Sequence, residues 1–404
     1  MNNRATNLIL FIFSPFLSLF KSISDLKRGN LSALYYIGAF IALFCAYLPP
    51  TSDAYRYREL FYQTTDFNLN LAELYVTQKD FLYSFLSWTL NSMGVPFEVF
   101  KFILLFVSIS AFFWMCIDAI KTNPNIVNNK KILILAATAT IFSIRYFTIA
   151  YGLRFGTAST LIVVAIYLFY KHSYTKAIIL YLLCCSMHFS MLMFIPIIGG
   201  AWLLKIWNPS PTIRLICIVG SYIAASSILG QLLEQIMGEN ELLDRTTDAY
   251  ITGFWGEEAT SQMSFNGLMF SYIRIFPIFP LAYFVLSNKK TSVLKEICFL
   301  LTLFLCITHT SITLLLRYSA PAISLAFVLF LLQDNHSGNS ISKFKIILAS
   351  FLIVLGSYIY ALRANFPTGY QYLACLSPIT LATIDFSYSN EWVYTHIDTE
   401  GYIR

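Results

Sequence analysis

Long apolar stretches recur along the chain from Leu31 to Ile359, and short polar segments separate them. Each stretch is about 20 residues long, the length that an α-helix needs to cross the hydrocarbon core of a bilayer. The pattern therefore predicts an all-α, polytopic integral membrane protein with about 10 to 12 transmembrane helices. We expect one membrane domain over residues 31–384, preceded by an interfacial or membrane-dipping segment over residues 1–30 and followed by a C-terminal tail over residues 385–404.

The composition supports this class. Of the 404 residues, 57% are hydrophobic and 12% are charged, whereas charged residues make up about 25% of soluble domains. The eight cysteines lie mostly within apolar runs and show neither a CxxC motif nor the Cys/His spacing of a metal site, so we interpret them as small hydrophobic side chains. We expect no metal and no cofactor. A net charge of +6 would suggest a nucleic-acid partner in a soluble protein, but here the basic residues are sorted into short loops. We therefore expect no nucleic-acid partner.

The basic residues indicate how the chain is oriented, because lysine and arginine concentrate in the cytoplasmic loops of membrane proteins. Six short loops carry such clusters: Lys21, Lys27 and Arg28; Lys121, Lys130 and Lys131; Lys171 and Lys176; Lys205 and Arg214; Lys289, Lys290 and Lys295; Lys343 and Lys345. With these loops in the cytoplasm, residues 49–98 and 231–265 form two large periplasmic segments. A helix expected over residues 81–95 is too short to span and would rest at this outer surface.

Four ionisable residues interrupt the apolar runs: Arg145, Arg154, His188 and Arg317. A charged side chain at membrane depth is costly, so it indicates a functional site by default. The lengths between the basic loops place all four at or near the outer ends of helical hairpins. The 28 residues of 177–204, for example, would form two short or tilted helices with a tip near residues 190–191.

Further polar residues are expected on the same face: Asp53, Arg56 and Arg58 in the first periplasmic segment, and Arg274 near the start of a later span. His309 lies eight residues before Arg317. Helical spacing would place both side chains on one face, with His309 about two turns deeper in the membrane.

Four phrases follow one another within residues 31–335: SDAYRYRELF at 52–61, DFLYSFLSWTLNSMGVPFEVFKFI at 80–103, RYFTIAYGLRFGTAS at 145–159 and CCSMHFSMLMFIPI at 184–197. In this order and spacing the chain resembles the EpsG-like family of Wzy-type O-antigen and exopolysaccharide polymerases. The third phrase departs from the family at two positions, since Tyr146 and Gly156 stand where Gln and Ala are common.

The resemblance implies a membrane glycosyltransferase of GT-C-like architecture in the bacterial inner membrane. Such polymerases join two repeat units carried on undecaprenyl diphosphate, one as donor and one as acceptor, at the periplasmic side. They release undecaprenyl diphosphate. The implied partners are these lipid-linked oligosaccharides, the lipid bilayer, a chain-length regulator and a flippase.

The candidate residues suit that chemistry. A guanidinium presents a planar fork of donors that matches phosphate oxygens, so we predict that Arg145, Arg154 and Arg317 bind the diphosphate. The acceptor hydroxyl needs a base within reach, and Asp53 and His188 are the two catalytic candidates. Arg56, Arg58, Arg274 and His309 are further candidate substrate contacts.

Each candidate also has a structural interpretation. Arg145 and Arg154 would merely lock their hairpin if they paired with acidic residues of the outer loops, and Arg317 would snorkel to the interface as long basic side chains do. The histidines would be packed core residues. Ser52 and Asp53 would suit the N-cap of a helix over residues 54–61.

Two other function classes fit part of the pattern. An O-antigen ligase, or another lipid-linked transferase, uses the same diphosphate donor, so only the order of the four phrases separates it from a polymerase. A lipid-glycan flippase or other transporter would place charges through the depth of the membrane, whereas the charges here gather at one boundary. The sequence therefore favours a polymerase.

The orientation can be tested by cysteine labelling in a variant that lacks the eight native cysteines. Cysteines introduced as Asp66→Cys and Asp248→Cys should react with a membrane-impermeant maleimide in intact spheroplasts, because both positions lie in the predicted periplasmic segments. Asn128→Cys and Gly338→Cys should stay unlabelled until the cells are lysed. The reverse pattern would disprove the orientation.

Overall fold

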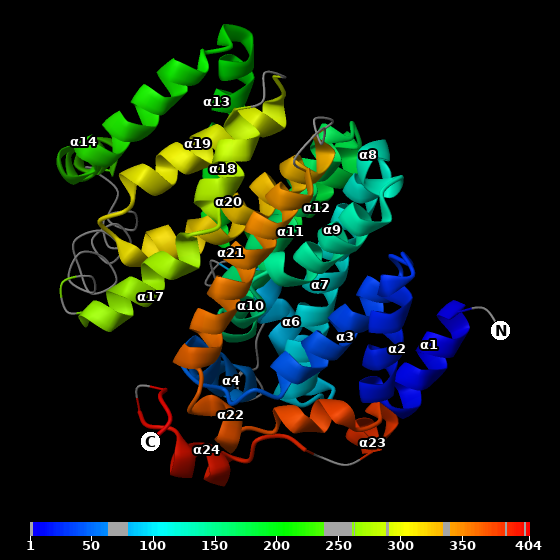
Figure 1. Ribbon diagram of the computed structural model, residues 1–404. Helices are drawn as coiled ribbons and strands as arrows, with labels where there is room; N and C mark the ends of the chain where they lie inside the picture. The colour runs from blue at the N-terminus through cyan, green and yellow to red at the C-terminus, as the bar shows by residue number, and fades with distance from the viewer. Residues whose placement is uncertain are drawn as a thin grey trace. The chain divides into compact units, whose positions relative to one another are not determined.

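A computed structural model describes residues 3–63, 80–237, 261, 263–287, 291–333, 340–383, 386–399 and 401–404, with the backbone alone at 225–237. Across these ranges the chain is helical and contains no β-strand (Figure 1). Its contacts divide it into two compact units. The first comprises Met1–Leu192, His336–Phe344 and Tyr358–Arg404, and the second comprises Met193–Asn335 and Lys345–Ser357.

The first unit packs α3 and α11 against the long helix α7, and α12 against α11. Its core is aromatic, and Phe100, Phe112 and Phe113 on α7 are fully buried. The unit contains α1 (Asn3–Phe13), α2 (Pro15–Lys27), α3 (Ala33–Ala46), α4 (Asp53–Gln63), α6 (Phe81–Ser92), α7 (Phe97–Lys121), α8 (Pro124–Val127), α9 (Lys130–Ser143), α10 (Tyr146–Tyr151), α11 (Leu153–Tyr170), α12 (Tyr174–Met187), α22 (Asn365–Thr368), η2 (Gln371–Cys375), α23 (Pro378–Thr383) and α24 (Asn390–His396), and a short 3-10 helix, η1 (Phe189–Met193), lies at its boundary.

The second unit is built around α19, which packs against α13, α14 and α20. Its described helices are α13 (Phe194–Trp207), α14 (Pro211–Met237), α17 (Phe265–Ile275), α18 (Ile278–Leu286), α19 (Val293–Ile307), α20 (Ile312–Leu332) and the central part of α21 (Ser340–Ala361). A buried ion pair joins two of them: the two Nη atoms of Arg214 on α14 donate to the two carboxylate oxygens of Glu296 on α19, with a distance of 2.9 Å between Nη2 and Oε1. Arg214 Nε also donates to the Pro209 carbonyl at 3.1 Å.

Helix length and hydropathy confirm the membrane class. In the described ranges seven helical stretches are long and apolar enough to cross a bilayer: Phe97–Lys121, Lys130–Tyr151, Leu153–Tyr170, Phe189–Trp207, Phe265–Leu286, Ile312–Leu332 and Ser340–Ala361. Three shorter apolar helices accompany them, at Ala33–Ala46, Tyr174–Met187 and Pro211–Ala224. The protein is therefore an all-helical, polytopic membrane protein, while the count of 10 to 12 spans and the GT-C-like architecture stay predictions.

The break predicted near residues 190–191 is confirmed, because α12 ends at Met187, η1 follows and α13 begins at Phe194. That the two helices form a hairpin stays a prediction. The short helix expected over residues 81–95 is α6, and its place at the outer surface stays a prediction. The N-terminal segment contains two helices, because Pro15 at the start of α2 fixes a backbone suited to a helix N-terminus and lacks the N–H to continue α1. Phe13, Leu17 and Phe20 expose their side chains there.

The Arg214–Glu296 pair generates a stability prediction. Glu296→Gln should lower the free energy of unfolding by about 3–5 kcal/mol, because removing one partner leaves a buried charge without compensation. Thermal or denaturant unfolding of the purified protein in a fixed detergent measures this loss. Asp118→Asn is the matched control: the Asp118–Lys171 pair is about one-third exposed, so its removal should cost no more than about 1 kcal/mol. Equal losses in the two variants would contradict the assigned role of the buried pair.

Candidate active site

Two breaks in the helical backbone position Arg154. Arg145 precedes α10, and Gly152 separates α10 from α11. Gly156 allows the two helices to approach, because a Cβ added there would lie 2.5 Å from the Ile149 Cα and 2.8 Å from the Thr148 carbonyl oxygen, both of which are backbone atoms. The close approach places Arg154 in the first turn of α11, beside the break.

Asp80 is the central residue of the site. Its Oδ2 accepts a hydrogen bond from Arg154 Nη1 at 2.8 Å, and its Oδ1 accepts one from the backbone N–H of Phe189 at 3.1 Å. Only 7% of the Asp80 side chain is exposed, whereas 34% of the Arg154 side chain is exposed. One carboxylate therefore joins the start of α11 to the start of η1.

Two tyrosines complete the surroundings of Arg154. The guanidinium carbon lies 4.9 Å from the ring centroid of Tyr57 on α4 and 5.8 Å from that of Tyr83 on α6. Burial raises the pKa of the Tyr83 phenol far above its usual value, so this hydroxyl stays neutral. The partly buried Asp53 lies in the first turn of α4, four residues before Tyr57 and so on the same face of the helix.

His188 lies in the turn between α12 and η1, and 8% of the residue is exposed. Its ring packs edge-on against Phe155, the neighbour of Arg154, and stacks on Phe189. Its Nδ1 accepts the backbone N–H of Ser190 at 3.2 Å and lies 2.8 Å from the Ser190 hydroxyl oxygen. With Nδ1 as an acceptor, the neutral ring carries its proton on Nε2. The Nδ1 lone pair of His188 is therefore engaged within the turn.

Helix α4 carries two arginines, of which Arg58 is buried and Arg56 is exposed. Arg58 Nη2 donates to the Tyr388 carbonyl at 2.6 Å and to Asn390 Oδ1 at 2.9 Å. The Ser52 N–H donates to the Gly401 carbonyl at 2.6 Å. The C-terminal segment 386–404 therefore packs against α4, at the end of the first unit where α4, α22 and α24 lie together (Figure 1).

The sequence interpretation did not single out the buried charges Asp80, Glu98 and Lys101, although all three lie in the quoted phrase 80–103. Glu98 accepts the Tyr388 N–H at 3.2 Å, and Lys101 Nζ donates to the Leu48 carbonyl at 3.1 Å. The signal that could have found them is the one that identified the arginines, namely a charge within an apolar run.

Arg274, His309 and Arg317 belong to the second unit. The expectation that His309 and Arg317 share a helix face is wrong: α19 ends at Ile307 and α20 begins at Ile312, so His309 lies in the connecting turn. Its Nδ1 lies 2.8 Å from the Cys306 carbonyl oxygen, and its ring stacks on Tyr222 with centroids 4.2 Å apart. Arg274 on α17 and Arg317 on α20 are half-buried.

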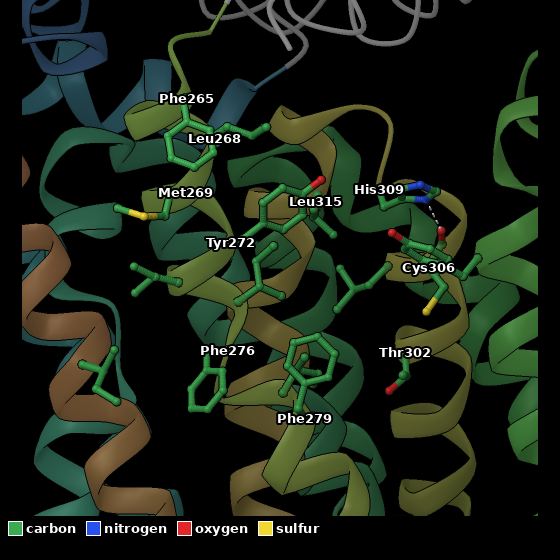
Figure 2. Close-up of a pocket in the computed structure, with 16 residues that line it drawn as sticks. Phe265, Leu268, Met269, Tyr272, Phe276, Phe279, Thr302, Cys306, His309 and Leu315 are labelled. Carbon is green, nitrogen blue, oxygen red and sulfur yellow. Dashed lines mark hydrogen bonds between the residues drawn. The ribbon is translucent and has the colours of Figure 1, made fainter. Parts of the chain in front are cut away.

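His309 borders an apolar cavity of about 700 Å³ within the second unit. Figure 2 shows Phe265, Met269, Tyr272 and Phe276 on one side of this cavity, and Thr302, Cys306 and His309 on the other. Several of the lining side chains, such as Phe265 and Phe279, are also exposed on the surface. The cavity thus suits a hydrocarbon chain, because its lining is almost entirely apolar.

A family model described as the EpsG family matches residues 32–376. The chain belongs to the EpsG family. The match includes every candidate site residue from Asp53 to Arg317, as well as Asp80. No curated protein and no solved structure matches the chain significantly. EpsG membership makes the protein a membrane protein of the polysaccharide-polymerase type.

In this EpsG protein the first unit therefore brings together Asp80, Arg154, His188 and Tyr57, with Asp53 one helical turn away from Tyr57. Arg145 is buried at the break before α10. The predicted roles of Asp53, Arg145, Arg154, His188 and Arg317 in binding and catalysis remain predictions. Among the described residues no group of three or more His, Cys, Asp or Glu side chains is placed to hold a metal ion.

The role of Arg58 in holding the C-terminal segment is testable by proteolysis. Arg58→Met should raise the rate of chymotrypsin cleavage after Tyr394 or Tyr402 about tenfold or more, because hydrogen bonds to charged groups contribute about 1.5–3 kcal/mol and cleavage follows the population of the open segment. Arg56→Met, on the exposed side of the same helix, should leave the rate unchanged. An unchanged rate in Arg58→Met would show that Arg58 does not hold the segment.

Proposed function

We propose that the protein is an O-antigen or exopolysaccharide polymerase that joins undecaprenyl-diphosphate-linked repeat units on the periplasmic side of the bacterial inner membrane. The observation that carries the proposal is the EpsG match over residues 32–376. The cluster around Arg154 supports the proposal, because Asp80 joins the Arg154 guanidinium to the turn that carries His188 in the first unit.

The proposed reaction is a glycosyl transfer. The bond between C1 of the donor glycan and the diphosphate oxygen breaks, and a bond forms between C1 and a hydroxyl oxygen of the acceptor unit. The hydroxyl proton passes to a base, and undecaprenyl diphosphate leaves with the electron pair of the broken bond. Arginine donors stabilise the negative charge that develops on the departing diphosphate. Arg154, Arg145 and Arg317 would supply these donors.

Asp53 is the stronger of the two base candidates. A base must be able to accept a proton, and the His188 Nδ1 already accepts the Ser190 N–H. Asp53 is partly exposed in the first turn of α4, on the face that carries Tyr57 toward Arg154. In this proposal Asp53 takes the acceptor proton, and His188 donates a hydrogen bond to the substrate.

The apolar cavity of the second unit would take part of the isoprenoid chain of a lipid-linked substrate. One wall of the cavity comes from the stretch Phe265–Leu286, which is long and apolar enough to cross a bilayer. The aromatic side chains Phe265, Phe276 and Phe279 make this wall apolar (Figure 2). Such burial stabilises a hydrocarbon chain by dispersion contacts with the walls.

The proposal is tested by chain extension with the purified protein and purified lipid-linked repeat units, with products resolved by length on a gel. The wild-type protein should form polymer, and a chelator should not change its rate. Asp53→Asn should lower the rate by about 100-fold to 10,000-fold, as expected when a general base is lost. His188→Gln, which keeps an N–H donor, should lower it by much less. Arg145→Lys, Arg154→Lys and Arg317→Lys keep the charge but lose the planar fork, so each should shorten the polymer.

Asp118→Asn serves as the control, because it makes the same carboxylate-to-amide change in a pair that is about one-third exposed, between Asp118 on α7 and Lys171 at the end of α11. Transfer of the glycan to a lipid A core acceptor without chain extension would identify a ligase. Movement of the lipid-linked unit across vesicles without any transfer would identify a flippase. Either result would overturn the polymerase proposal.

A further inference from the structure

We infer that Asp80 is a positioning residue of the site: it holds the Arg154 guanidinium and the segment that follows His188 in one fixed arrangement. The inference rests on the proposed function for the reaction that this arrangement serves. Its structural part, the link among Asp80, Arg154 and η1, can be tested without any activity.

The two oxygens of Asp80 bind two different elements. Oδ2 accepts from Arg154, 74 residues away along the chain, and Oδ1 accepts from the Phe189 N–H, 109 residues away. Because the carboxylate is rigid and nearly buried, a shift of either element would break one of the two bonds. The carboxylate thus couples the position of Arg154 to that of the His188 turn.

Arg154 is held in a way that leaves donors for a ligand. Asp80 accepts from Nη1, Tyr57 accepts a further side-chain hydrogen bond, and the rings of Tyr57 and Tyr83 lie against the guanidinium. The Nε–H of Arg154 is buried and donates no hydrogen bond to any described residue. A buried donor without an acceptor is costly, and a phosphate oxygen would satisfy it. The stacking and the Asp80 bond together fix the plane in which the fork presents its donors.

Asp80 itself is a poor catalytic base. Its Oδ2 already accepts from Arg154 Nη1, and its Oδ1 already accepts the Phe189 N–H. Both oxygens are therefore engaged with elements of the fold. Asp80 therefore acts on the reaction through Arg154 and the His188 turn.

A double-mutant cycle separates positioning from a general contribution to folding. Asp80→Asn should lower kcat for chain extension about 100-fold, the size of effect expected when a reacting group is misplaced by about 1 Å. In an Arg154→Gln background the same substitution should cost about tenfold or less, because one of the two elements that it positions is already lost. Equal costs in the two backgrounds would overturn the inference.

Hydrogen exchange supplies a readout that does not depend on activity. Asp80→Ala removes the acceptor of the Phe189 N–H, so exchange in peptides covering residues 188–193 should accelerate at least tenfold, while Asp118→Asn should leave them unchanged. Unchanged exchange in Asp80→Ala would overturn the inference, whatever the activity. If wild-type protein forms no polymer but the exchange result holds, the proposed function fails and the structural link stands.

Asp80→Glu is a milder variant, chosen in case Asp80→Asn or Asp80→Ala fails to fold. It keeps the charge and one carboxylate but adds a methylene, so the ion pair can form with the guanidinium displaced. We expect normal amounts of protein in the membrane and a kcat lowered about tenfold, with a KM changed less than kcat. A wild-type kcat in Asp80→Glu, combined with inactivity of Asp80→Asn, would show that only the charge matters and would overturn the positioning role.

Discussion

Compensation of buried charge is the constraint on which both units depend. Removing an ion from water costs several kcal/mol, and a partner must offset that cost. Asp80 compensates Arg154 in the first unit, and Glu296 compensates Arg214 in the second. Lys101 reaches the carbonyl of Leu48, which lies at the end of α3 where the helical hydrogen bonds stop. Each of these charged side chains therefore links two elements of the fold.

The pairing with Asp80 fixes the position of Arg154 without using all of its hydrogen-bond donors. It binds an acidic residue of the first predicted periplasmic segment, as the structural interpretation of the hairpin arginines required. That bond uses one Nη group of a fork with five N–H donors. Tyr57 takes a further side-chain hydrogen bond, and about a third of the Arg154 side chain stays exposed. A locked arginine is also a pre-organised one, because it loses little conformational freedom when a ligand binds.

Irregular backbone occurs beside the polar groups. Gly152 and the segment before Tyr146 interrupt the helices around Arg154, and the turn at 188–193 carries His188. Backbone of this kind is tolerated at membrane depth only where protein or a polar cavity satisfies its hydrogen bonds. In the first unit Asp80 meets this need for Phe189. The EpsG chain thus combines its helix breaks with its charges in one place.

The sequence by itself determined the membrane class, the helix break near residues 190–191, the short helix within residues 81–95 and the family, because hydropathy and ordered phrases are local along the chain. It also indicated that Arg154 and His188 belong to one face. It did not reveal that Asp80 joins them, that Arg58 holds the C-terminal segment, or that His309 lies in a turn. Those facts depend on contacts between residues 74, 330 and 109 positions apart and on where a helix ends. Only packing decides them, because a carboxylate or a guanidinium in an apolar run can be satisfied by any partner that the fold brings within hydrogen-bond distance.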